Sequence, residues 1–184
     1  MCLDLGTEQG RQVVRQIATT CDVVVQNFRP GTVEALGLGY ADLVKVNKTI
    51  IFASISGFGE SGPYAKKRVY DPIIQALSGL TDIQADSESG RPKMMRTVIP
   101  DKVTALTAAQ GITAALLQRE RTGEGQHLRL AMLDAMIAFL WPEGMINLTV
   151  VDEVRDLRIG QLALDLIFQT SDGYITAGAM SDDE

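Results

Sequence analysis

The chain has 184 residues, enough for roughly one domain with a buried core. Apolar residues make up 46% of it and charged residues 22%, which is ordinary for a soluble globular protein. The formal net charge of −6 argues against a nucleic-acid partner, because no basic stripe is present to neutralise phosphates. The sequence contains neither a run of about 18 apolar residues nor a signal-peptide pattern, so we expect a cytoplasmic protein without a membrane partner.

The cysteines and the single histidine offer little for metal or triad chemistry. Cys2 and Cys21 form no Cys-x-x-Cys pair and no metal-ligand spacing, so we expect reduced thiols. His127 is the only histidine, so a His-based zinc site or a Ser-His-Asp triad has little support in the sequence. We therefore expect no metal site, and we expect His127 to be a packed or surface residue.

The first third of the chain alternates between helical and strand patterns. A β-branched run such as DVVVQ is typical of a parallel strand that is buried on both faces. This alternation indicates βαβ units and a mostly parallel sheet, and so an α/β fold. The expected elements are the end of a strand at 1–5, a helix opened by Thr7, a strand at 22–26, short helices at 32–37 (capped by Thr32) and 40–46, and a strand at 49–56.

A glycine loop at 57–62 follows the second strand and fits the pattern G-x-G-x-x-G. The dinucleotide interpretation needs a helix that begins within the motif, but Pro63 and the polar run 64–68 follow instead. The pattern therefore favours a flexible loop, which glycines allow to close over a ligand. The basic cluster Lys66-Lys67-Arg68 fits either a solvated loop or contact with a small anionic ligand.

Two Asp-Pro or Pro-Asp pairs mark helix starts in the middle of the chain. Asp71-Pro72 predicts a helix with Asp71 as N-cap that ends at Gly79, followed by a surface loop at 82–92. Pro100-Asp101 predicts Asp101 as the N-cap of a long helix, buried over most of its length, that Gly123 ends. Residues 126–131 alternate like a strand, and an apolar helix at 132–149 should end or kink at Pro142.

The C-terminal part predicts a change of architecture. Residues 168–176 form a predicted hairpin that turns at Asp172-Gly173, and hence a change from parallel to antiparallel structure. We expect a partial Rossmann-like large domain at 1–150, which includes the long helix, then a linker at 151–166 and the start of a small α+β subdomain at 167–184.

Four stretches of this chain resemble family III CoA-transferases, the group that includes formyl-CoA, carnitine and bile-acid CoA-transferases. Family members are longer, and the chain resembles their middle portion from about Leu3 onward. The stretches are Gln26–Gly31 with Leu36–Tyr40, Ser54–Pro63, Tyr70–Gly79, and Asp101 through Arg119-x-x-Thr-Gly-x-Gly-Gln126.

The resemblance implies CoA transfer with Asp101 as the catalytic nucleophile. The aspartate would form a mixed anhydride and then an aspartyl-CoA thioester, and a helix N-terminus favours the anion that attacks. No permanently bound cofactor is implied, because coenzyme A enters as acyl-CoA substrate. The family's CoA-contacting positions fall on Asn27, Phe28, Arg68, Tyr70 and Met132. The implied partners are an acyl-CoA, a carboxylic acid and a second copy of the chain in an interlocked dimer.

Three alternatives stay open at this point. Racemases of the same family move a proton on the α-carbon, which needs two acid/base groups, and they resemble a His-Asp pair where this chain has Tyr70-Asp71. Tyrosine there favours transfer. The chain could also be a truncated, non-catalytic piece of a longer enzyme. Asp101 could be a helix cap without a catalytic role.

Overall fold

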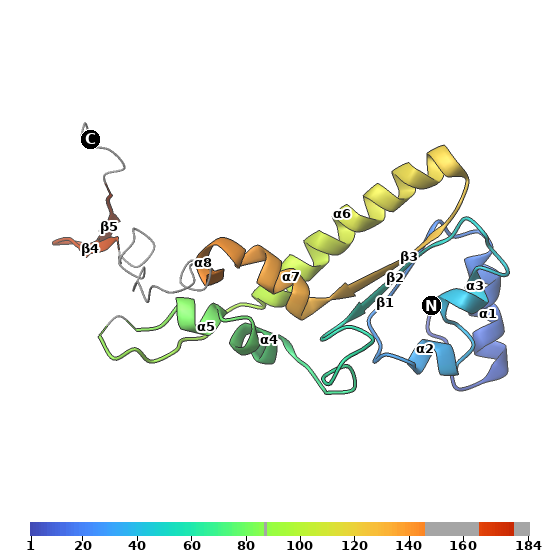
Figure 1. Ribbon diagram of the computed structural model, residues 1–184, viewed down its shortest axis with the longest axis horizontal. Helices are drawn as coiled ribbons and strands as arrows, with labels where there is room; N and C mark the ends of the chain where they lie inside the picture. Colours follow the sequence, from blue (N-terminus) through green and yellow to red (C-terminus); the bar gives the residue numbers. More distant parts are fainter. Residues whose placement is uncertain (87, 146–165, 179–184) are drawn as a thin grey trace, which may run out of the picture.

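The computed structural model describes residues 1–86, 88–145 and 166–178 (Figure 1). Three parallel strands form its main sheet in the order β1-β2-β3, with bounds Val23–Gln26, Ile51–Ser56 and Gln126–Ala131. Phe52 of β2 lies in register with Val24 of β1 and His127 of β3. The parallel, Rossmann-like α/β architecture predicted from the sequence is confirmed.

Helices cover both faces of this sheet. On one face the long helix α6 (Ile99–Thr122) contacts β2 and β3. On the other, Phe52 joins a buried cluster with α1 (Glu8–Ala18), α2 (Thr32–Ala35) and α3 (Tyr40–Leu43). Figure 1 shows these two layers on opposite sides of the strands. The sheet is therefore the middle layer of a three-layer arrangement.

Four further helices of the described chain lie beyond the carboxyl ends of the strands. A second apolar cluster joins Ile74, Leu80, Met136 and Leu140, with Met132 packed against it. The helices of this cluster are α4 (Asp71–Leu77), α5 (Leu80–Ile83) and α7 (Met132–Phe139). The short helix α8 (Trp141–Met145) follows α7. No helix among the described residues is long and apolar enough to span a membrane.

The N-terminal predictions were right in kind and partly wrong in detail. Thr7 caps α1 by accepting a hydrogen bond from the Gly10 N–H at 3.1 Å, as predicted. Residues 1–5 form no strand. The burial of 22–26 on both faces was also wrong, since β1 pairs only with β2 in the described chain and Val25 is 55% exposed. Gly31, and not Thr32, caps α2, and both short helices end earlier than expected.

Both predicted aspartate caps lie one position or more inside their helices. Asp71 is the first residue of α4 after Tyr70, and Asp101 is the third residue of α6 after the cap position Val98. Proline explains the shift, because a residue without an N–H fits the first turn and the helix can begin before it. At the other end Gly123 ends α6 with φ 74°, as predicted.

The predicted burial of α6 over most of its length was wrong. Its buried residues are Pro100, Thr104, Ala108 and Ala115, which lie on one side of the helix. Leu106 and Leu117 on other sides are 68% and 56% exposed. Only one side of α6 meets the sheet and its neighbouring helices within the described chain.

The predicted hairpin is confirmed, and the predicted helix from Met132 ends before Pro142, whereas the division into a large domain, a linker and a small subdomain stays a prediction. The helix that starts at Met132 ends at Phe139, and Pro142 lies in the first turn of α8. Strands β4 (Ile167–Gln169) and β5 (Tyr174–Thr176) form the antiparallel hairpin around Asp172-Gly173. The expected continuation of the helix to residue 149 and nearly all of the expected linker lie outside the described residues. The short helix α5 was not predicted.

His127 is packed on the sheet face that carries α1–α3. Its Nε2 lies 2.8 Å from the Ser54 hydroxyl, and its ring stacks on Tyr40 with centroids 4.9 Å apart. Its Nδ1 is buried without a partner in the described chain. Burial, and secondarily the Arg129 charge, lower the pKa of His127 below its ordinary value of 6.5. The fold therefore favours the neutral ring.

We expect acid to destabilise the protein through His127. The unfolded chain takes up this proton near pH 6.5, whereas the folded chain does so only at lower pH, so stability falls as pH drops below 6.5. Urea denaturation between pH 7.5 and pH 5 measures this dependence. A His127→Gln variant should lose part of the slope. An identical slope in the variant would contradict the assignment.

Gly125, which immediately precedes β3, should not tolerate a side chain. A Cβ there would overlap the Ile50 backbone, including its carbonyl oxygen. Gly125→Ala is expected to lower the free energy of unfolding by about 2 kcal/mol, a typical cost of overpacking. Gly173→Ala is the matched control, since no atom lies within 4 Å of its added Cβ. Urea denaturation of both variants tests the difference, and equal stability would contradict it.

Candidate active site

Two adjoining cavities lie at the carboxyl edge of the parallel sheet. They measure about 490 and 220 Å³. Such an edge is where open α/β sheets bind ligands, because the loops after the strands converge there. The residues that line both cavities, and so join them into one cleft, are Asn27, Ser56, Gly57, Val69 and Tyr70.

Asp101 lines the larger cavity from the first turn of α6. Its side chain is exposed, and its carboxylate accepts no hydrogen bond from the described residues. Partial burial, followed by the negative charge of Asp71, raises the pKa of Asp101 above its ordinary value. Within the described part of the chain the carboxylate is thus accessible and without a partner, which suits a nucleophile or a base.

Asp71 lines the same cavity but is buried and engaged. One carboxylate oxygen accepts a hydrogen bond from Gln75 Nε2 at 2.7 Å, and the other accepts one from the Asp101 backbone N–H at 3.2 Å. The Asp71-Pro72 pair in the sequence indicated only a cap role for Asp71, and nothing in that pair pointed to Gln75. Their four-residue spacing on one helix was the available signal, since such residues share a helix face.

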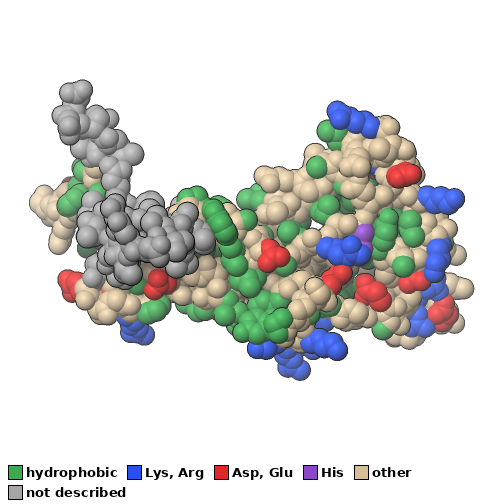
Figure 2. Space-filling model, in the orientation of Figure 1, with side chains coloured by type: hydrophobic (Ala, Val, Ile, Leu, Met, Phe, Trp, Pro, Cys, Tyr) green, Lys and Arg blue, Asp and Glu red, His purple; other side chains and the backbone are tan. Residues whose placement is uncertain are grey.

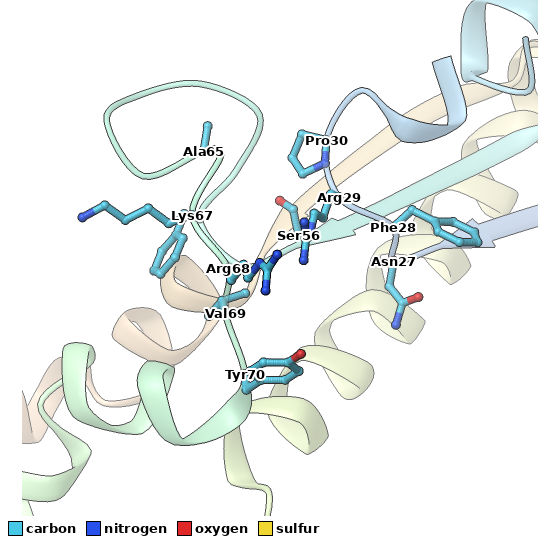
Figure 3. A pocket seen from close by; sticks show the side chains of 12 residues that line it. Asn27, Phe28, Arg29, Pro30, Ser56, Ala65, Lys67, Arg68, Val69 and Tyr70 are labelled. Atoms are coloured by element: carbon cyan, nitrogen blue, oxygen red, sulfur yellow. The ribbon is translucent and has the colours of Figure 1, made fainter. Parts of the chain in front are cut away.

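The smaller cavity has a basic wall. Figure 3 shows Arg29 and Arg68 near one another beside Ser56, while Lys67 points away. The Lys67 ammonium lies 3.8 Å from the centre of the Tyr64 ring. Neither arginine forms an ion pair within the described chain, so both guanidinium groups are available to an anion. Elsewhere Lys and Arg are scattered over the face shown in Figure 2.

The structure brings all six predicted site residues to the cleft. Asn27 and Phe28 follow β1, and the Phe28 N–H donates to Gln26 Oε1 at 2.8 Å. Tyr70, 72% exposed, precedes α4 and lines both cavities. Asp101 and Met132 line the larger cavity, and Phe28 and Arg68 line the smaller one.

The glycine loop after β2 forms part of the cleft wall. No helix begins within it, so the dinucleotide interpretation is not supported. A Cβ at Gly57 would overlap the Val69 side chain, which explains glycine at this position. The Leu133 N–H donates to the Gly57 carbonyl at 3.1 Å and ties α7 to the loop. Among the described residues no group of three His, Cys, Asp or Glu side chains could hold a metal ion.

A model of the family described as CoA-transferase family III matches residues 1–184. The chain belongs to this family. The resemblance inferred from the four sequence stretches is thereby confirmed.

Several relatives of this family III chain carry names for CoA transfer. It is 33% identical to a succinate–glutarate CoA-transferase of Agrobacterium fabrum over 97% of the chain and 45% of that protein. It is 34% identical to a mouse succinyl-CoA:glutarate CoA-transferase over 97% of the chain and 41% of that protein. The chain thus spans less than half the length of these relatives.

Solved structures agree with the family assignment. A CaiB/BaiF family protein from Brucella suis superposes with a TM-score of 0.81 at 34% identity, over 94% of this chain and 46% of that one. A Mycobacterium tuberculosis protein titled hypothetical gives a TM-score of 0.82 at 32% identity, over 97% and 47%. The fold of this family III chain is therefore that of CaiB/BaiF proteins.

Proposed function

We propose that the complete protein transfers CoA from an acyl-CoA to a carboxylic acid, with Asp101 as the nucleophile. The observation that carries the proposal is the exposed Asp101 carboxylate, which has no hydrogen-bond partner among the described residues and lines a cleft with a basic wall. Relatives named for succinyl-CoA:glutarate and succinyl-CoA:mesaconate transfer support the reaction class.

The reaction balances without an external proton or oxidant. An Asp101 oxygen attacks the thioester carbonyl, the C–S bond breaks, and CoA leaves as thiolate with a mixed anhydride formed. The thiolate attacks the Asp101 carbonyl, which releases the donor acid and gives an aspartyl-CoA thioester. The acceptor carboxylate attacks that thioester, the C–S bond breaks, and CoA thiolate leaves as a second anhydride forms. The thiolate then attacks the acceptor's carbonyl, which gives the new acyl-CoA and restores Asp101.

The cleft offers chemically matched contacts for CoA. Arg68 has no ion-pair partner among the described residues and is suited to a phosphate, and Phe28 and Tyr70 offer exposed aromatic surface. Met132 at the start of α7 offers an apolar contact near Asp101. Asn27 lines both cavities and would contact the ligand between the phosphates and the thioester. We propose these five residues as the CoA-binding set on this side of the cleft.

A racemase reaction has less support. It needs a second acid/base group opposite Asp101. Asp71, the nearest carboxylate, is buried with both oxygens hydrogen-bonded, and His127 lies on the sheet face that carries α1–α3.

A homodimer is proposed by analogy with the family. The non-catalytic alternative concerns only a protein that consists of these 184 residues, since the relatives are longer.

Covalent capture tests the role of Asp101. The complete protein is incubated with succinyl-CoA and other acyl-CoAs and then analysed by peptide mass spectrometry, with and without hydroxylamine. We expect an adduct of CoA mass on the Asp101 peptide that hydroxylamine removes. Asp101→Asn should abolish it, and the exposed control Asp82→Asn should not. A folded protein that binds acyl-CoA but forms no adduct would contradict CoA transfer, and α-proton exchange in deuterated water would then support the racemase.

Arg68 should contribute to CoA affinity through charge. Arg68→Gln is expected to weaken CoA binding on the order of tenfold, a loss typical of one charge-assisted hydrogen bond. Lys66→Gln is the matched control, because Lys66 is exposed in the same loop and lines neither cavity. Isothermal titration with CoA measures both variants. Equal losses in the two would show that the loop acts only by its net charge.

A further inference from the structure

Asp71 is a buried carboxylate next to the exposed one of Asp101. Its side chain is only 6% exposed. A buried carboxylate is costly unless its oxygens are hydrogen-bonded, and both oxygens of Asp71 are. One of those bonds comes from the backbone of Asp101 itself, across 30 residues of sequence.

The first turn of α6 depends on this hydrogen bond. The first N–H groups of a helix have no partner within the helix. Val98 at the cap position supplies no side-chain hydrogen bond, and Pro100 has no N–H. The Asp101 N–H is instead capped from α4 by the Asp71 carboxylate. The residue proposed to react is therefore anchored at its own backbone nitrogen.

Gln75 holds Asp71 and the segment that leads into α6 at the same time. It is 2% exposed. Its amide nitrogen donates to Asp71 Oδ1 at 2.7 Å and to the Thr97 carbonyl at 3.1 Å, and its Oε1 accepts from the Met95 N–H at 3.0 Å. One buried amide thus connects α4, residues 95–97 and, through Asp71, the first turn of α6.

We propose that Asp71 and Gln75 are positioning residues for Asp101, which fix its backbone and keep a negative charge beside its carboxylate. The assignment rests on the proposed role of Asp101 as nucleophile. A fixed backbone limits the positions that the carboxylate can take, and small misplacements of a reacting group reduce rates strongly. The negative charge makes the Asp101 carboxylate more basic and so more nucleophilic.

Other titratable groups lie on the elements around Asp101. They are Tyr70 before α4, Lys102 on α6, Arg68 in the preceding loop and Asp134 in the first turn of α7. The Lys102 ammonium is held 2.7 Å from the Thr97 hydroxyl. The charge that raises the pKa of Asp101 is that of Asp71. Removal of that charge should therefore be visible in the pH dependence of the reaction.

The test measures the rate of Asp101 adduct formation against pH in the complete protein, with succinyl-CoA as the probe. Asp71→Asn keeps the shape of the side chain, removes its charge and replaces one acceptor oxygen by an NH2 group, so we expect the acid limb of the profile to move to lower pH and the neutral rate to fall on the order of tenfold. Gln75→Met should lower the rate without moving the acid limb. Asp82→Asn and Gln84→Met are exposed controls that should match the parent.

The outcomes separate this assignment from the proposed function. A parent protein without an Asp101 adduct would overturn the proposed function and the assignment with it. An adduct in the parent, with unchanged rate and acid limb in both variants, would overturn the positioning role alone. If circular dichroism shows that Asp71→Asn does not fold, Gln75→Met decides, and a parental rate in that variant overturns the assignment.

Discussion

The pairing of β2 with a parallel strand on each side is the interaction on which the rest of the structure depends. Ile51 to Ala53 are fully buried between the two helical layers, so the direction of β2 is set by the core. Because β1 and β3 run the same way, Asn27, Gly57 and Met132 arrive at one edge of the sheet. Because Gly57 has no side chain, Val69 packs closely against it. The chain thereby returns over that edge of the sheet and completes the wall of the cleft.

Side chains of opposite charge line the two cavities of the cleft. The larger cavity contains Asp71 and Asp101 and no basic residue in its described lining, while the smaller one contains Arg29 and Arg68. A ligand with an anionic end and an uncharged reactive end fits this order, with its phosphates away from the carboxylates. An acyl-CoA has that layout at its thioester, which carries no charge. The arrangement favours one orientation of the ligand, because the reverse would bring phosphates next to two acids.

The sequence predicted best those features that neighbouring residues determine. The β-branched runs predicted β1 and β2, and Gly123 predicted the end of α6. The helix starts and the burial of β1 and α6 were misjudged, because a proline permits more than one start and burial depends on distant neighbours. The site residues came from the resemblance, and their roles stay predictions. The contact between Asp71 and Asp101 joins residues 30 positions apart, so no local pattern contained it.

The exposure of Asp101 has a consequence for side reactions. A carboxylate that solvent reaches would, once acylated, leave its activated carbonyl open to hydrolysis. Each such event would hydrolyse one acyl-CoA without transfer, which is the reaction of a thioesterase. Exclusion of water is therefore as important to the chemistry as the nucleophile is. Within the described residues Asp101 is exposed, so the proposed chemistry requires that the bound substrate exclude water from its carboxylate.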